Sequence, residues 1–168
     1  MARSSRRSAL GFLIFFALFW CGITGVFDGF IARTIYRQSR AESYPTTTGI
    51  VTKGDISSET STDSDGHTST TYRANISFRY DVDGRTYTSN TYRYGAMGSS
   101  DRSYAESVFE RYPVDAEVTV HHNPRDPSDA ILEVGVSGIE MFMILFLTPF
   151  NLVGLWLLAM VGRWIRRR

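Results

Sequence analysis

The segment ISFRYDVDGRTYTSN, residues 76–90, decides the fold of the middle of the chain. Up to Asp83 its apolar and polar residues alternate, which is the period of a strand with one buried face. Asp83-Gly84 is a two-residue turn of the kind that closes hairpins with matched twist. Pairing across this turn places Tyr80 opposite Tyr87, so the alternation and the turn predict the same register. The neighbouring pairs in this register are Arg79 with Thr88 and Asp81 with Thr86.

The hairpin lies between two apolar runs that are long enough to cross a bilayer. The first, residues 9–31, has no charge before Asp28, and the second, residues 139–162, is uncharged from Met141 to Val161. At about 1.5 Å per residue such a run spans roughly 30–35 Å as a helix, and a hydrocarbon core is about 30 Å thick. Both runs are expected to be helical, because backbone amides cannot go unpaired in lipid. The net charge of +1 and the hydrophobic content of 43% hide this partition.

A cleaved signal peptide is the alternative interpretation of the first run. The chain begins with the basic stretch MARSSRR, but the apolar run is longer than the segment of about 7–15 residues that such peptides contain. Bulky Phe19 and Trp20 precede Cys21, where lipoprotein processing requires small residues. We therefore favour an uncleaved anchor.

Basic residues at the ends of the two runs predict the orientation. Seven arginines lie at the outer ends and four Lys or Arg residues on the loop side, which predicts cytoplasmic termini and an extracytoplasmic segment at 32–138. The membrane expected is the bacterial inner (plasma) membrane. The predicted segments are a basic tail (1–8), a first spanning helix (9–31), a connector (32–43), a β domain (44–134), a second spanning helix (139–162) and a second basic tail (163–168).

Small residues form a stripe on the first helix. Ala17, Cys21, Gly25 and Gly29 recur every four residues, and the two glycines form a G-x-x-x-G motif that lets another helix approach closely. That helix is either the second one of the same chain or a helix of a second copy.

A proline interrupts the second apolar run. Pro149 removes a backbone donor, which predicts a kink, and Asn151 is expected to repair or cross-link the helix interface. A conduction path lined by Asn151 is disfavoured, because the sequence shows no second intramembrane charge at that depth.

The rest of the middle predicts a β domain with one short helix. Four to six strands are expected to form a mainly antiparallel barrel or sandwich. Residues 56–71 read as a solvated loop, in which Asp63 and Asp65 suggest a turn rather than an incomplete calcium loop. Residues 103–112 predict the helix, with Ser103 and Glu106 as a capping box.

No residues point to catalysis, a cofactor or a metal. Cys21 is the single cysteine, and the neighbouring histidines His121 and His122 point to opposite faces of a predicted strand. Ser, Asp and His occur in no hydrolase motif. Membrane boundaries already account for the clustered basic residues, so a nucleic-acid partner is not expected. The chain is therefore expected not to be an enzyme.

Three stretches of the middle domain together resemble a known family. They are YPTTTGIV (44–51), FRYDVDGRTYTS (78–89) and YPVDAEVTVHHNPRDPSDAILE (112–133). In this order they are similar to small membrane proteins labelled domain of unknown function three-five-nine-two, whose β-rich domain commonly lies between hydrophobic helices. Tyr44 replaces a Trp of the family pattern, Asp115 a Gly, and His122 an aromatic residue. The resemblance implies membrane location and a β domain, and supplies no activity.

The residues of this pattern are expected to specify the fold rather than to bind a ligand. They are Gly49, Tyr80, Asp83, Gly84, Tyr87, Pro124 and Pro127.

The sequence favours a non-enzymatic, membrane-tethered module. Its β domain is expected to bind or scaffold near the membrane surface, with membrane lipid and a membrane or envelope protein, or a second copy, as partners. Tethering raises the effective concentration of neighbours in the same membrane. An accessory subunit of a larger complex, assembled through the helices, is the alternative, and an envelope hydrolase ranks last.

Overall fold

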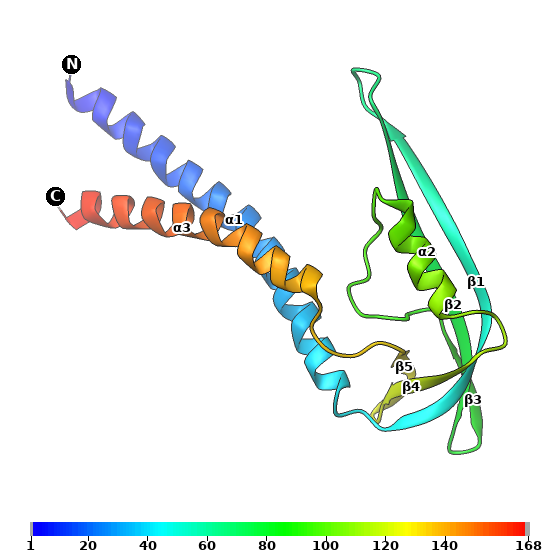
Figure 1. The fold of residues 1–168 in the computed structure, drawn as a ribbon. Helices are drawn as coiled ribbons and strands as arrows, with labels where there is room; N and C mark the ends of the chain where they lie inside the picture. The colour runs from blue at the N-terminus through cyan, green and yellow to red at the C-terminus, as the bar shows by residue number, and fades with distance from the viewer. Residues whose placement is uncertain (1, 167–168) are drawn as a thin grey trace. The chain divides into compact units, whose positions relative to one another are not determined.

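The computed structural model describes residues 2–166, with side chains from Gly11 onward. Two compact units divide the chain: residues up to Ile35 with those from Val136, and Tyr36–Gly135. The elements in chain order are α1 (Ala2–Ala41), β1 (Thr46–Thr62), β2 (Thr68–Val82), β3 (Arg85–Ser89), α2 (Arg102–Arg111), β4 (Glu117–Asn123), β5 (Asp126–Ile131) and α3 (Gly138–Arg166) (Figure 1).

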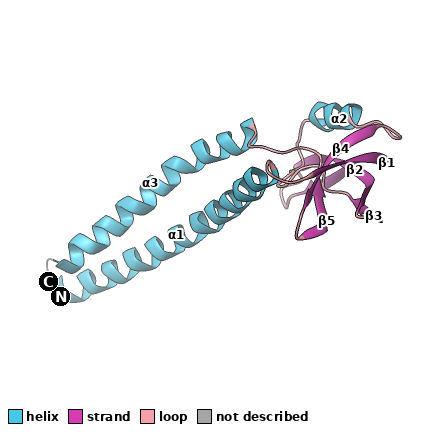
Figure 2. Ribbon diagram, turned by 90° about the horizontal axis from the view of Figure 1, so that it is seen from below, coloured by secondary structure: helices cyan, strands magenta, loops and turns pink. Residues whose placement is uncertain are grey.

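The two long helices run antiparallel, side by side (Figure 2). Each is long and apolar enough to cross a membrane. The helix of the first run continues through most of the expected connector, as far as Ala41. No proline lies between Gly29 and Ala41, so nothing stops the helix there. Of the basic tails, the side chains of residues 1–8 and all of residues 167–168 lie outside the described part.

The five strands form one antiparallel sheet in the order β3-β2-β1-β4-β5. The sheet curves, so that the two outer strands approach each other. The Ser89 hydroxyl at the end of β3 donates to the Ala130 carbonyl of β5 at 3.0 Å. Of the two expected architectures, the fold is therefore closer to a partly closed barrel than to a two-sheet sandwich.

The predicted hairpin is confirmed in its register. Tyr80 pairs with Tyr87, and their rings stack with centroids 5.9 Å apart. Asp83 and Gly84 both have positive φ, 52° and 74°, as a hairpin turn with matched twist requires. The flanking pairs are the expected ones, Arg79 with Thr88 and Asp81 with Thr86.

The buried face of this hairpin forms the core of the β domain. Ile76, Phe78 and Tyr80 are almost fully buried, and Val51 of β1 and Val120 of β4 pack into the same cluster. Every second residue of β2 therefore points inward, as the alternation predicts.

The polar loop predicted at 56–71 is wrong, because most of it is strand. β1 and β2 pair from Ser57–Arg73 out to Thr62–Thr68 and form a long two-stranded ribbon. Asp63 closes the ribbon: its Oδ1 accepts the backbone N–H groups of Asp65 and His67 at 3.0 and 2.8 Å. The Ser/Thr content that suggested a loop is compatible with strands, since Thr favours extended backbone.

The capping box predicted for the short helix is also wrong. α2 begins at Arg102, and its N-cap is Asp101, whose side chain accepts the N–H of Ser103 at 2.9 Å. A hydrogen bond with the Ser103 side chain, followed by this backbone bond, lowers the pKa of Asp101. Ala105 and Val108 form the buried face of α2, which lies along the β1–β2 ribbon in Figure 1.

Asp115 occupies a position that favours glycine. It has φ of 67° in the turn before β4, and its N–H donates to the Val51 carbonyl at 2.9 Å. A left-handed conformation costs a residue other than glycine about 1–2 kcal/mol, less for Asp. This explains in physical terms why the family pattern has glycine here.

We expect Asp115→Gly to keep or raise the free energy of unfolding and Asp115→Val to lower it by about 1–2 kcal/mol. Glu117→Gly is the matched control, because Glu117 is an exposed residue of β4 with no positive φ. This control should lose about 0.5–1 kcal/mol through the flexibility of glycine. Urea unfolding followed by circular dichroism measures all three; a loss of stability in Asp115→Gly equal to that in Glu117→Gly would contradict the explanation.

Candidate functional site

Metal-binding clusters are absent from the part of the chain that the structure describes, residues 2–166. His121 and His122 lie on opposite faces of β4, because successive side chains of a strand alternate. The His122 side chain is buried, and in the pairing with β5 His121 lies opposite Ile131 and His122 opposite Ala130. Burial lowers the pKa of His121. The Nδ1 atoms of both rings are buried without a hydrogen-bond partner among the described residues, and they cannot share one metal ion because the two side chains lie on opposite faces.

The two apolar helices make specific polar contacts with each other. The Trp20 indole N–H donates to the Phe150 carbonyl at 3.0 Å, and the two rings stack. The Asn151 amide donates to Asp28 Oδ1, also at 3.0 Å. Asn151 therefore cross-links the helices, one of the two roles expected for it.

Small residues allow α1 and α3 to approach at one level. A Cβ on Gly154 would lie 3.3 Å from Cys21 Sγ, and Ala17 is buried one turn before Cys21. Gly25 and Gly29 lie outside this contact, because a Cβ on either would meet nothing within 4 Å. The predicted stripe thus divides: its first half faces α3, and its G-x-x-x-G half is open.

A charged residue lies beside Asn151, contrary to the expectation that disfavours a conduction path. The Asn151 amide is hydrogen-bonded to the Asp28 side chain. In the sequence, Asp28 lies near the end of the first apolar run. The antiparallel register of α1 and α3 brings it to the middle of the second apolar run instead.

A polar cluster ties the last turns of α1 to the sheet. Asp129 of β5 accepts the Arg37 guanidinium and the Tyr94 hydroxyl, each at 2.8 Å, and the Asn123 amide at 3.4 Å. The Arg37 guanidinium also lies 3.8 Å from the centroid of the Tyr94 ring. Burial, followed by the bond to Asp129, raises the pKa of Tyr94.

Buried contacts complete this junction. Gln38 and Ala41 are fully buried, and the Gln38 amide donates to the Tyr94 carbonyl at 3.2 Å. Ala41 packs with Tyr94 and Ile131 in a small second core. We call these residues, with Arg37 and Asp129, the junction cluster.

The junction cluster was not predicted from the sequence. In the structure, buried or half-buried residues recur along α1 at spacings of three and four: Ala17, Cys21, Thr24, Asp28, Ile31, Thr34, Gln38 and Ala41. This period continues past the end of the apolar run. Half of these residues are polar, so a pattern of apolar residues alone does not carry the helix through the connector.

The residues predicted to specify the fold lie at packing and turn positions. The Tyr80 hydroxyl donates to the Pro127 carbonyl at 2.7 Å, and burial, followed by the charge of Asp129, raises its pKa to about 12. A Cβ on Gly49 would lie 2.6 Å from Val120 Cγ2 and 2.9 Å from the Arg79 carbonyl, so no side chain fits there. Pro124 lies in the turn between β4 and β5.

A second polar cluster surrounds Glu133. Its carboxylate accepts the Arg111 guanidinium and the Tyr112 hydroxyl, and lies 3.8 Å from Arg93. Burial, followed by this carboxylate, raises the pKa of Tyr112 to about 12. The carboxylate of Glu133 is thus held by charged and hydroxyl partners from three other residues, as in a structural tie.

A family model matches the β domain of the chain. The model of a domain of unknown function, DUF3592, matches residues 47–137, from β1 to the residue before α3. The chain belongs to this family. The resemblance inferred from the sequence is thereby confirmed, and the match covers the whole sheet of the DUF3592 domain together with α2. No curated protein sequence matches the chain.

We expect Asp129→Ala to lower the free energy of unfolding by about 2–3 kcal/mol, because it leaves the Tyr94 hydroxyl without its acceptor and Arg37 without its counter-charge. Asp126→Ala is the control in the same strand, since Asp126 is exposed and its carboxylate accepts hydrogen bonds from the N–H and the hydroxyl of Ser128, two residues further on. It should lose less than about 1 kcal/mol. Urea unfolding of the full chain in detergent measures both; equal losses would show that Asp129 is not the centre of the junction cluster.

Proposed function

We propose that the chain is an integral membrane protein that presents its DUF3592 domain as a non-enzymatic interaction module at the membrane surface. Both termini lie in the cytoplasm and residues 32–138 outside it, in the cell envelope. Two observations support the parts of this proposal: the exposed apolar surface of the helices, and the contacts that hold the carboxylates of the β domain in place.

The exposed apolar surface of α1 and α3 supports lipid as their solvent. Phe12, Leu18 and Leu145 are 69%, 66% and 72% exposed. Only 17% of an apolar stretch of 18 residues in each helix is buried. A core helix of a soluble protein buries most of such a stretch. Apolar patches of this size on a soluble protein promote association, whereas hydrocarbon chains cover them in a bilayer.

The contacts between the helices support retention of the first one. Thr24 and Ile31 of α1 are buried, and Asp28 has a specific partner in Asn151 of α3. A segment removed by signal peptidase makes no such contacts in the mature protein. This favours an uncleaved anchor over a signal peptide.

The polar clusters of the domain support binding rather than catalysis. The carboxylates of Asp129 and Glu133 are each held by a guanidinium and a tyrosine hydroxyl. Groups engaged in this way stabilise the fold. The surface of the domain is therefore the part available to a partner.

Membrane insertion and orientation are tested together. The chain should stay in the pellet after alkaline carbonate extraction, at the full mass of the uncleaved chain. In a Cys21→Ala background, Ser64→Cys in the turn of the ribbon should react with a membrane-impermeant maleimide in intact cells. Ser4→Cys is the matched control and should react only after permeabilisation. Release by carbonate, a shortened N-terminus, or the opposite labelling pattern would each contradict the proposal.

A second candidate function, an accessory subunit assembled through its helices, is favoured by the open half of the small-residue stripe. Gly25 and Gly29 are exposed, with no neighbour within 4 Å of their Cβ positions. Small residues at this spacing let helices approach closely in lipid, where association depends on packing.

Cross-linking in native membranes followed by mass spectrometry separates the two candidates. If the domain carries the interaction, Gly25→Ile with Gly29→Ile should leave recovery of partners unchanged, since these residues lie on a lipid-facing helix. Loss of all partners in this variant would instead favour the accessory subunit. Gly11→Ile, equally open in α1, is the control for the added side-chain volume. Recovery of the chain with nothing but itself would contradict both candidates.

A further inference from the structure

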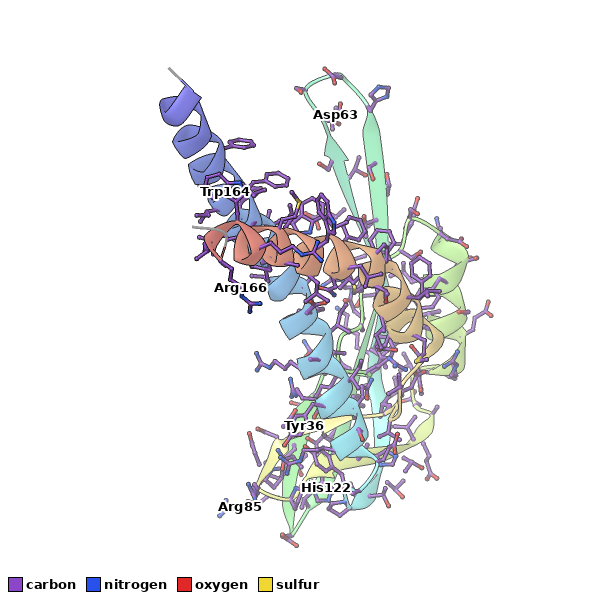
Figure 3. The ribbon with its side chains drawn as sticks, turned by 90° about the vertical axis from the view of Figure 1, so that its left-hand side faces the viewer. Tyr36, Asp63, Arg85, His122, Trp164 and Arg166 are labelled. Atoms are coloured by element: carbon purple, nitrogen blue, oxygen red, sulfur yellow. The ribbon has the colours of Figure 1, made fainter. Side chains whose placement is uncertain are left out.

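Tyr36 and Arg40 form an exposed pair on the last turns of α1, where Figure 3 labels Tyr36. The Arg40 guanidinium donates to the Tyr36 hydroxyl oxygen at 3.3 Å and lies 5.7 Å from the centroid of the Tyr36 ring. Because the hydroxyl oxygen accepts this bond, the hydroxyl proton can be donated to another group, and the guanidinium has further N–H groups for the same purpose. The pair therefore presents several donors to one acceptor.

The Arg40 side chain points back along α1, toward the apolar run. Long side chains of a helix lean toward its N-terminus, and the contact with Tyr36, four residues earlier, shows that Arg40 does so. The apolar run ends at Ile31, and Tyr36 follows five residues later, at about 7.5 Å along the helix. The polar layer on each side of a hydrocarbon core is about 5–8 Å thick. The donors of both side chains are therefore expected at the level of the lipid headgroups.

Two acids could neutralise Arg40, and both are directed elsewhere. Asp129 accepts the Arg37 guanidinium at 2.8 Å. Glu42, in the turn after α1, has its Oε1 only 3.3 Å from the Cβ position of Gly135. The charge of Arg40 is therefore available to a ligand.

The exposed face of α1 selects lipid as the occupant of this pair. Val26, Arg33 and Arg40 recur every seven residues, so they lie on one face of the helix, and all three are exposed. This face changes from apolar to positive where the apolar run ends. The Tyr36 ring, 60% exposed, suits the same boundary, because its body is apolar and its hydroxyl polar. An acidic protein segment could match the charge, but only lipid also continues over the apolar part of this face.

We propose that Tyr36 and Arg40, with Arg33 beside them, bind the phosphate of an anionic phospholipid headgroup at the extracytoplasmic surface of the bilayer. The proposal rests on the membrane insertion and orientation proposed above, and it names the class of lipid and the residues. A phosphate accepts several hydrogen bonds at once, and a guanidinium matches it in geometry and charge. A zwitterionic headgroup carries a cationic group that offsets the phosphate charge, so it is attracted less strongly.

Lipid binding to the purified full chain in detergent tests the selectivity. Native mass spectrometry measures binding of dioleoyl phosphatidylglycerol, which is anionic, and of dioleoyl phosphatidylcholine, which is zwitterionic. Phosphatidylglycerol should bind at least about fivefold more tightly, and added salt should reduce the difference. Equal affinities of the two lipids would overturn the proposal. Inorganic phosphate in excess should leave phosphatidylglycerol bound, whereas displacement would mean that the site takes free phosphate instead of a headgroup.

Removal of one charge locates the site. Arg40→Gln should weaken phosphatidylglycerol binding by about fivefold, the contribution of one basic residue at an anionic surface, and Arg40→Lys should recover most of the loss. Arg73→Gln is the matched control: it removes the same charge from an exposed residue of β2 and should weaken binding by less than about twofold. Equal effects of Arg40→Gln and Arg73→Gln would show that the lipid senses only net charge, contrary to the proposal.

Tyr36→Phe tests the hydroxyl, since it keeps the ring and removes one donor. It should weaken phosphatidylglycerol binding by about twofold or more, and unchanged binding would exclude the hydroxyl from the site. The unfolding midpoint of Arg40→Gln should equal that of the parent chain, because Arg40 is exposed and its side chain contacts Tyr36. A loss of lipid in this variant is then a loss of the site rather than of the fold.

A peptide that alternates aspartate and serine tests the other occupant. It should leave phosphatidylglycerol bound to the parent chain. If it displaces the lipid, and binds less well to Arg40→Gln, the pair serves an acidic protein segment and the proposal is wrong. Carbonate extraction and maleimide labelling are measured separately, so a failure of lipid selectivity leaves the proposed function standing.

Discussion

The β domain depends on a buried tyrosine whose hydroxyl needs an acceptor. Tyr80 of β2 is 2% exposed and donates to the Pro127 carbonyl of β5. In the strand order β1 and β4 lie between these two strands, so the bond forms only when the sheet curves. The register of the hairpin, which directs Tyr80 inward, therefore also determines how far the sheet closes. The single cysteine, Cys21, lies outside this domain, so packing and hydrogen bonds alone hold the curvature.

Local patterns predicted the parts of the fold that local physics determines. The Asp83-Gly84 turn and the alternation of β2 act on the same few residues and agree, and the structure has the same register. The two apolar helices were predictable for a similar reason, since length and hydropathy suffice. The family resemblance, which runs through both hairpins, added the extent of the domain.

The parts that were missed depend on contacts between distant residues. The ribbon between Ser57 and Thr71 has little apolar content, and only pairing with the other strand makes it extended. Asp129 stands between Ser128 and Ala130, which mark no site, and its role follows from Arg37, which lies 92 positions away in the chain. For the candidate site the sequence therefore showed no metal-binding or catalytic motif, and the junction cluster became visible only in the structure.

The length of the ribbon has a consequence for the dynamics of the domain. Two strands without a third strand or a buried face are only marginally stable in water, so the part beyond α2 should open locally at a fraction of the energy that unfolds the core. Amide protons near the Asp63 turn should then exchange with solvent long before those of Phe78. Hydrogen exchange would then resolve the ribbon and the core as two separate unfolding steps of one domain.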